Sequence, residues 1–242
     1  MRSLILILAF LAGMQSALAA DRGREQRWAD EILPAVLEGD PVWLAQADGH
    51  KFLGLYLAPA KAAGAIILVH GMGVHPDFGV IGALRTRLAE MGYATLSIQM
   101  PVQGREAGPG DYLDTFPEAS ERITKAAAWL QAKGYGRIAL VSHSLGGRMA
   151  RAHVLASKST PIKAWAALSM GFDDYQGVPL PVLDVYAEVD HPPVVMMTTT
   201  RKQTQIHALS EQRQLAAANH FYEGKEAEVA ALVRDWLGKV LK

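Results

Sequence analysis

The chain has 242 residues, 50% of them hydrophobic, and its 24 Lys and Arg residues balance its 24 Asp and Glu residues. The length fits one domain of ordinary size, and zero formal charge without a basic run argues against nucleic acid as a partner. Because the chain has no cysteine, disulfides, thiolate nucleophiles and cysteine metal sites are excluded.

The first residues have the pattern of a secretory signal peptide. Arg2 supplies a positive start, residues 4–14 form an apolar stretch, and an Ala-Leu-Ala cleavage signal ends at Ala19. We expect residues 1–19 to be removed, leaving residues 20–242 as a single domain in the periplasm or the medium. An uncleaved N-terminal anchor is the alternative. No later segment is long and apolar enough to span a bilayer, so we expect no integral membrane span after cleavage.

The next part of the chain predicts a helix and then a hairpin. Residues 21–40 carry mixed charges and have apolar residues near helical spacing, which predicts a short amphipathic helix. Residues 42–47 and 51–56 flank the turn sequence Asp48-Gly49-His50, and this order predicts an N-terminal β-hairpin.

From residue 65 onward, short apolar runs alternate with amphipathic stretches. The runs predict strands over residues 65–69, 93–99, 137–141, 162–170, 182–188 and 213–218. The amphipathic stretches predict helices over residues 78–91, 118–133, 144–156, 194–207 and 225–240. This alternation is typical of the α/β class. It predicts a mostly parallel, doubly wound sheet of about eight strands with helices on both faces.

The junction between the strand at 137–141 and the following helix carries a small-x-Ser-x-Gly pattern around Ser144. A nucleophilic serine must project from a very tight turn, so the residues two before and two after it must be small. Gly146 meets this need, and Ser142 meets it less well than glycine. A serine at a helix start also lies beside free backbone N–H groups and the positive end of the helix dipole.

Over roughly residues 42–240 the sequence resembles the α/β-hydrolase family. The family's elbow is Gly-x-Ser-x-Gly, and here Ser142-His143-Ser144-Leu145-Gly146 departs from it at the first glycine. The resemblance implies an α/β-hydrolase fold with Ser144 as nucleophile.

A second motif, His70-Gly71-Met72-Gly73, directly follows the strand at 65–69. In family members a His-Gly pair at this place leads into the loop that donates an N–H group to the oxyanion hole. By this resemblance we assign the backbone N–H of Met72, with that of Leu145 as its partner. Two preset donors of this kind stabilise the tetrahedral oxyanion.

The acid and base follow the nucleophile in the order Ser, Asp or Glu, His. Family members often place the acid in a Gly-x-x-Asp segment, and Ala187 to Asp190 matches it with alanine for glycine. We therefore choose Asp190, keep Glu188 in reserve and set Asp184 aside because it lies inside a strand.

His220 follows the last strand and precedes the last helix, where the family carries its base. It would take the proton from Ser144 while Asp190 fixes its tautomer. We expect His191 to be unable to reach the elbow, His143 to pack beneath it, and His207 to lie in a helix. His50 and His153 have no motif around them, and the loop of His75 could line the pocket.

The substrate side of the site is less specified. Only residues 171–181 connect two strands where many relatives insert a lid, so we expect a mostly open site flanked by the loop at 101–117. We predict a serine hydrolase that cleaves small-molecule carboxylic esters or thioesters and needs no cofactor and no metal. A peptidase or acyltransferase, and a non-catalytic envelope or binding protein, are the alternatives. The oligomeric state stays open.

Overall fold

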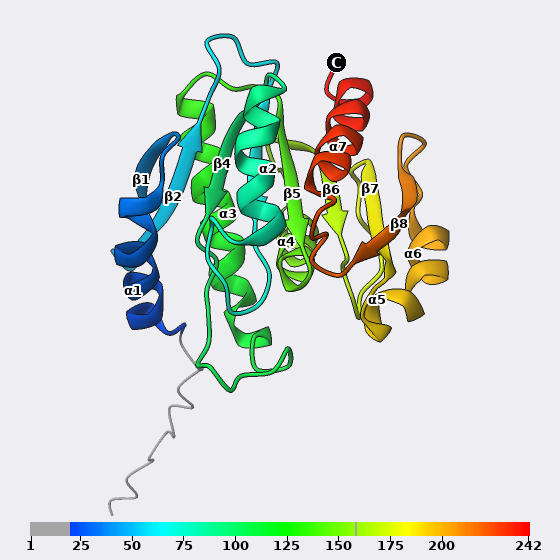
Figure 1. Ribbon diagram of the computed structural model, residues 1–242, viewed down its shortest axis with the longest axis horizontal. Coiled ribbons are helices and arrows are strands. Elements are labelled where there is room, and N and C mark those ends of the chain that lie inside the picture. Colours follow the sequence, from blue (N-terminus) through cyan, green and yellow to red (C-terminus); the bar gives the residue numbers. More distant parts are fainter. Residues whose placement is uncertain (1–19, 158) are drawn as a thin grey trace, which may run out of the picture.

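The computed structural model describes residues 20–157 and 159–242, so the predicted signal peptide lies outside it. Its centre is one sheet in the order β1-β2-β4-β3-β5-β6-β7-β8 (Figure 1). The strands are β1 Asp40–Ala45, β2 Lys51–Leu57, β3 Ala65–Val69, β4 Ala94–Ile98, β5 Ile138–His143, β6 Ile162–Leu168, β7 Val182–Val189 and β8 Glu211–Asn219. β2 pairs antiparallel with β1 and β4, and all other neighbours are parallel. The predicted sheet and hairpin are confirmed.

Helices cover both faces of the sheet, with α2 and α7 on one side and α3 and α4 on the other (Figure 1). The helices are α1 Arg22–Ile32, α2 Gly79–Glu90, α3 Phe116–Ala132, α4 Leu145–Ala156, α5 Pro192–Met196, α6 Thr198–Thr204 and α7 Glu226–Val240, with 3-10 turns η1 Leu33–Ala35 and η2 Leu113–Thr115. In β3, Ile66 and Leu68 join the core beneath α2 and α7, whereas Ile67 and Val69 join the core beneath α3 and α4. Alternate residues of a strand point to opposite faces, so a continuous apolar run is buried on both.

The predicted N-terminal helix is shorter than the apolar spacing suggests. α1 ends at Ile32 and continues only as the 3-10 turn η1, which contains Pro34. Proline has no backbone N–H to continue the α-helical hydrogen bonds. Leu37, at the end of the apolar pattern, is 94% exposed. Ala29 and Ile32 instead pack on Leu53 and Leu55 of β2.

The prediction of one helix over residues 194–207 is wrong. The structure has two short helices, α5 and α6, and His207 lies in a bend after them. The guanidinium of Arg201 donates a 3.0 Å hydrogen bond to the carbonyl of Val194, which would otherwise serve a continuing helix. The other predicted elements are present, with ends displaced by a few residues.

The connection from the end of β6 to the start of β7 contains no helix. Residues 171–181 form only turns and irregular backbone, as their number predicts. The carboxyl ends of β5, β7 and β8 are therefore flanked by α5 and by the loop from residue 101 to 115 (Figure 1).

A buried ion pair fixes α6 to the sheet. Arg201 donates to both carboxylate oxygens of Asp184 at 3.1 and 2.9 Å, and both side chains are fully buried. Asp184 also accepts hydrogen bonds from Tyr175 and Gln212 at 2.9 and 2.8 Å. Asp184 is thus engaged in structure, inside β7, as its position in the sequence indicates.

Replacement of Asp184 by asparagine should destabilise the fold, because it leaves the Arg201 charge buried without its partner. We expect a loss of about 3–5 kcal/mol in the free energy of unfolding, measured by urea denaturation. Asp235→Asn is the matched control, since its pair with Arg234 is exposed, and it should change the free energy of unfolding by no more than about 0.5 kcal/mol. Equal midpoints for the two variants would contradict the structural role of Asp184.

Candidate active site

Ser144 occupies the turn between β5 and α4 in a conformation that side chains rarely adopt. Its φ is 54° and its ψ is −123°. For a residue other than glycine this backbone costs of order 1–3 kcal/mol and persists only where the surroundings impose it. Here the Ser144 N–H donates a 2.8 Å hydrogen bond to the carbonyl of Leu168 at the end of β6. The turn predicted from the small-x-Ser-x-Gly pattern is present.

The backbone of α4 approaches the end of β3 so closely that Gly146 has to be glycine. A Cβ atom at Gly146 would lie 2.3 Å from the carbonyl oxygen of His70 and 2.7 Å from that of Val69. At Ser142, where the family pattern has glycine, the side chain is fully buried. Its hydroxyl accepts a 2.8 Å hydrogen bond from Nε1 of Trp165. The serine that replaces the family's glycine at position 142 is therefore accommodated by a hydrogen bond from Trp165.

Ser144, His220 and Asp190 form one hydrogen-bonded chain. Nε2 of His220 lies 3.0 Å from Oγ of Ser144, and Nδ1 lies 2.6 Å from Oδ1 of Asp190. Asp190 follows β7, and His220 follows β8. Because an ionised carboxylate only accepts, Nδ1 carries the proton and Nε2 presents its lone pair to the serine hydroxyl. This arrangement can take a proton from Ser144.

Asp190 is held as a carboxylate by donors from three segments. Ser169 Oγ donates to Oδ2 at 2.5 Å, and the backbone N–H groups of Ala187 and His191 donate at 2.9 and 2.8 Å. Burial alone would raise the pKa of Asp190, but the hydrogen bonds from His220, Ser169 and the two N–H groups lower it below its usual value. Sequence reasoning missed Ser169, whose only signal is its place directly after β6.

The two other acidic candidates lie away from His220. Glu188 is engaged with the backbone N–H of Ala217 at 2.7 Å, and Asp184 is paired with Arg201. Of the three carboxylates, only Asp190 contacts a histidine ring within the described part of the chain.

His191 lies against His220, a contact that the sequence did not predict. Its ring stacks on that of His220, with centroids 3.9 Å apart and an interplanar angle of 12°. The side chain thus covers one face of His220 at the cavity wall. The chain turns sharply between Asp190 and the start of α5, so Asp190 lies at the edge of the His220 ring and His191 on its face.

His143 lies beneath His220, in agreement with its predicted place under the elbow. It is 7% exposed, and its Nε2–H donates a 2.9 Å hydrogen bond to the backbone carbonyl of His220. Burial lowers the pKa of His143 to about 4, and the neighbouring His220 contributes in the same direction. At neutral pH the ring is therefore uncharged and serves to fix the His220 backbone.

His70 orients the peptide that carries the assigned oxyanion donor. Its Nε2 accepts a 2.9 Å hydrogen bond from the N–H of Met100, so its Nδ1–H donates to the carbonyl of Gly71 at 2.9 Å. Burial lowers the pKa of His70 to about 3 and keeps the ring neutral. In a trans peptide the carbonyl of Gly71 and the N–H of Met72 point in opposite directions. The Met72 N–H is thereby directed away from His70.

The N-terminal helix α1 fixes the far end of the same loop. Arg24 donates to the carbonyl of Gly73 at 3.2 Å and to that of Gln103 at 2.8 Å. The ring of Trp28 meets that of His75 edge-on with centroids 5.9 Å apart. The sequence predicts this helix, but not its contact with the loop beside the elbow.

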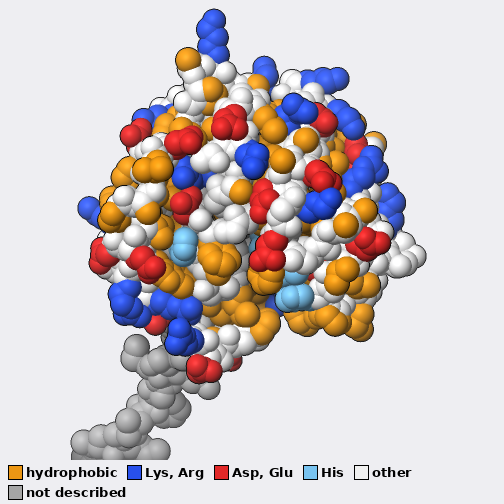
Figure 2. All heavy atoms as spheres, in the orientation of Figure 1, with side chains coloured by type: hydrophobic (Ala, Val, Ile, Leu, Met, Phe, Trp, Pro, Cys, Tyr) orange, Lys and Arg blue, Asp and Glu red, His pale blue; other side chains and the backbone are white. Residues whose placement is uncertain are grey.

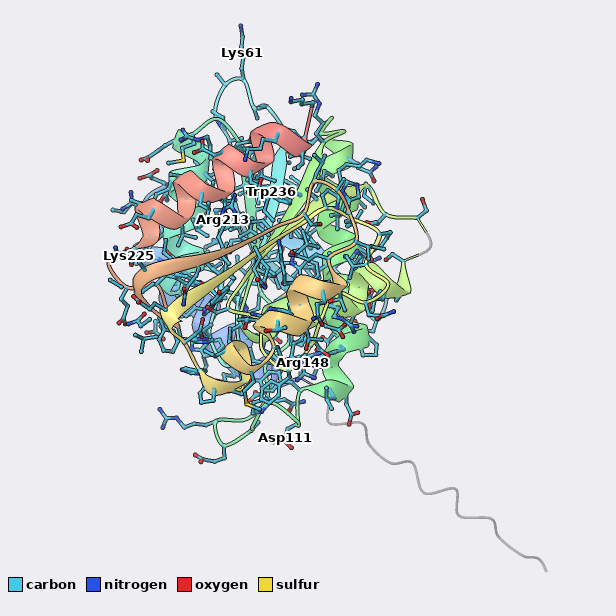
Figure 3. The ribbon with its side chains drawn as sticks, turned by 90° about the vertical axis from the view of Figure 1, so that its right-hand side faces the viewer. Lys61, Asp111, Arg148, Arg213, Lys225 and Trp236 are labelled. Carbon is cyan, nitrogen blue, oxygen red and sulfur yellow. The ribbon has the colours of Figure 1, made fainter. Side chains whose placement is uncertain are left out.

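A cavity of about 200 Å³ brings these segments together. Of the residues that the sequence assigns to the site, Asp190 is not among those that line the cavity, whereas the following are: His70, Gly71, Met72, Ser144, Leu145 and His220. Figure 3 shows Arg148, another lining residue, at the same end of the molecule as α5, opposite the end that carries Lys61. His50, His75, His153 and His207 are absent from its lining.

In the described residues, no cluster of three or more His, Asp or Glu side chains could hold a metal ion. The same part of the chain contains no helix that is long and apolar enough to cross a membrane.

Two protein-family models match the sequence. The model described as "Alpha/beta hydrolase family" matches residues 66–239, and one described as "Protein of unknown function (DUF3530)" matches residues 1–119. No curated protein matches the sequence.

Several solved structures share the fold. The dienelactone hydrolase from Anabaena variabilis has a TM-score of 0.66 at 20% identity, covering 84% of this chain and 99% of its own. The esterase domain of a Rhodothermus marinus protein has a TM-score of 0.64 at 14% identity and covers 84% and 99%. An α/β serine hydrolase without lid from Xanthomonas campestris has a TM-score of 0.65 at 16% identity and covers 85% and 96%. At these identities the likeness concerns the fold.

The buried neutral histidines predict how stability depends on pH. Between the usual histidine pKa of 6.5 and the folded value of about 4 for His143, the unfolded chain binds a proton that the folded protein does not. The free energy of unfolding should therefore fall as the pH is lowered through this window, by about 1.4 kcal/mol per unit of pKa difference. Urea denaturation at several pH values measures this dependence of the free energy of unfolding on pH.

His143→Gln should make this slope shallower, because the amide keeps a donor for the His220 carbonyl but does not titrate. His207→Gln, outside the site, serves as the control and should keep the wild-type slope. If His143→Gln and wild type have the same slope, His143 does not remain neutral in the fold.

Proposed function

Because the chain belongs to the α/β-hydrolase family, we propose that it is a serine hydrolase that cleaves carboxylic esters or thioesters through an acyl-enzyme on Ser144. The observation that carries this proposal is the continuous chain from Ser144 Oγ through His220 to Asp190, with separations of 3.0 and 2.6 Å. Oriented in this way, the imidazole is placed to act as a general base toward the hydroxyl.

In the acylation step, Ser144 Oγ attacks the substrate carbonyl carbon while its proton passes to Nε2 of His220. The carbonyl π electrons move to oxygen, and the resulting oxyanion accepts hydrogen bonds from the N–H groups of Met72 and Leu145. The ionised Asp190 stabilises the imidazolium that forms. Collapse of the intermediate breaks the bond to the alcohol or thiol, which leaves with the proton from Nε2.

Deacylation repeats the sequence with water. His220 takes one proton from water as its oxygen attacks the acyl carbon, and the second tetrahedral intermediate expels Ser144 Oγ. The proton on Nε2 returns to the serine, and the carboxylic acid departs. The assignment of Asp190 rather than Glu188 to the acid is supported by the donors that keep Asp190 ionised.

We also propose that the protein acts outside the cytoplasm, in the periplasm or the medium. The support for this is the signal-peptide pattern of residues 1–19.

Labelling with a fluorophosphonate tests the nucleophile. We expect wild type to gain the mass of one phosphonyl group and Ser144→Ala to gain none, because only an activated serine displaces fluoride. Ser159→Ala, at an exposed position after α4, is the control and should label like wild type. Intact mass spectrometry measures all three, and for exported protein it also reports whether the chain begins at Ala20.

Labelling of Ser144→Ala would place the reactive group elsewhere. If none of the three proteins reacts, the site is not catalytic, and the alternative of a binding protein with a hydrolase fold replaces the proposal.

The acid is tested by comparing two carboxylate-to-amide variants. Asp190→Asn should lower kcat strongly, because an amide at this place favours the wrong tautomer of His220, and the corresponding change in a serine protease costs about 10⁴-fold. Glu188→Gln should retain a rate close to wild type, since Glu188 accepts a hydrogen bond from the backbone of Ala217 and not from His220. Hydrolysis of a 4-nitrophenyl ester measures both, and the reverse order of the two rates would assign the acid to Glu188.

A further inference from the structure

The cavity beside Ser144 opens to solvent through a rim of exposed apolar side chains. Four of the residues that line it are large, apolar and substantially exposed: Met72 at 40%, Phe78 at 44%, Phe172 at 55% and Phe221 at 44%. We call these four side chains the apolar collar. They come from the loops after β3, β6 and β8, so they surround the opening from different sides.

The apolar surface continues from the collar onto α5. Pro193 and Val194 line the cavity, and the next two residues, Val195 and Met196, are 46% and 79% exposed. Figure 2 shows hydrophobic side chains gathered along the lower edge of the molecule, where α5 lies in Figure 1. Exposed apolar patches of this kind, next to a cavity, are typical of binding surfaces.

Among the residues that line the cavity, Arg148 is the only Lys, Arg, Asp or Glu. Its Nε donates to Asp173 at 2.7 Å. Its guanidinium also lies 5.6 and 5.5 Å from the ring centroids of Phe116 and Phe172. The positive charge is therefore already balanced by a carboxylate and stacked between rings, and the remaining wall favours an uncharged, apolar group.

The volume of the cavity limits how much of such a group it encloses. An apolar cavity of about 150 Å³ accommodates one benzene ring, and this one measures about 200 Å³. It can thus hold roughly eight carbon atoms. A longer chain bound at Ser144 has to leave the cavity and lie against the collar.

Building on the proposed hydrolase function, we propose that the substrates are esters or thioesters of a single, uncharged acyl chain of medium to long length. The first carbons fill the cavity, and the following methylenes cover the apolar collar. Each methylene that is removed from water should raise kcat/KM by up to about fourfold. The collar is then part of the acyl site.

The test compares 4-nitrophenyl decanoate with 4-nitrophenyl butanoate, both below the concentrations at which they aggregate. The measured quantity is the ratio of their kcat/KM values. We expect decanoate to be preferred by at least tenfold in wild type. The double variant Phe78→Ser/Phe172→Ser should lower this ratio several-fold, and Phe78→Leu/Phe172→Leu should restore most of it because leucine keeps the apolar surface.

Leu37→Ser is the matched control for removing an exposed apolar side chain, because Leu37 is 94% exposed and is not part of the cavity lining. It should leave the ratio unchanged. A wild-type preference for butanoate, or a ratio that the serine double variant does not change, overturns the proposal.

A binding measurement separates this proposal from the hydrolase function on which it rests. Nile red bound to Ser144→Ala should be displaced by 4-nitrophenyl decanoate, but not by 4-nitrophenyl butanoate at equal concentration. This result would support the collar without any turnover. If this displacement occurs while wild type hydrolyses neither ester, the hydrolase function fails and the acyl-chain site stands. If ester turnover is normal but 4-nitrophenyl decanoate does not displace Nile red, the collar proposal alone fails.

Sedimentation velocity tests whether the collar is instead a contact between protein molecules. If the collar variants change the sedimentation coefficient and leave the ratio of kcat/KM values unchanged, the acyl-site proposal is overturned.

Discussion

The site depends on the close approach of two backbone segments, the turn at Ser144 and the loop that follows β3. Parallel pairing of Val69 with Ser142 brings the ends of β3 and β5 side by side. Glycine at position 146 then allows α4 to start against the carbonyls of β3, where any Cβ atom would overlap them. This contact brings Met72 and Leu145 to the cavity that Ser144 also lines. The remainder of the fold serves to hold these two segments at this separation.

Hydrogen bonds to buried groups supply the orientation that packing alone cannot. Asp190 receives hydrogen bonds from Ser169 directly after β6, from Ala187 in β7 and from His220, and together they restrict the rotation of the carboxylate. His70 acts similarly on the peptide after Gly71. Arg24 reaches the same loop from α1, which precedes the residues matched by the α/β-hydrolase family model. A segment outside that match therefore takes part in shaping the site.

The sequence predicts the sheet, the hairpin and the residues at the strand ends, because hydrophobic periodicity and glycine positions are local properties. The resemblance to the family's Gly-x-x-Asp segment favours Asp190 over Glu188, and the position of Asp184 inside a strand sets that residue aside. The sequence does not predict how loops fold after they leave the sheet. The stacking of His191 on His220, the bond from Ser169 to Asp190 and the break between α5 and α6 all arise from contacts between segments distant along the chain or from a sharp turn. No periodic pattern encodes such contacts.

The backbone at Ser144 has a consequence for attempts to make this protein more robust. Glycine adopts a φ of 54° without the penalty that serine incurs. A domain of this kind is stable by only about 5–15 kcal/mol, so the strain of about 1–3 kcal/mol is a noticeable fraction of the total. A screen that selects variants solely for thermal tolerance would therefore favour glycine at position 144. It would enrich proteins that survive heating and have lost the hydroxyl.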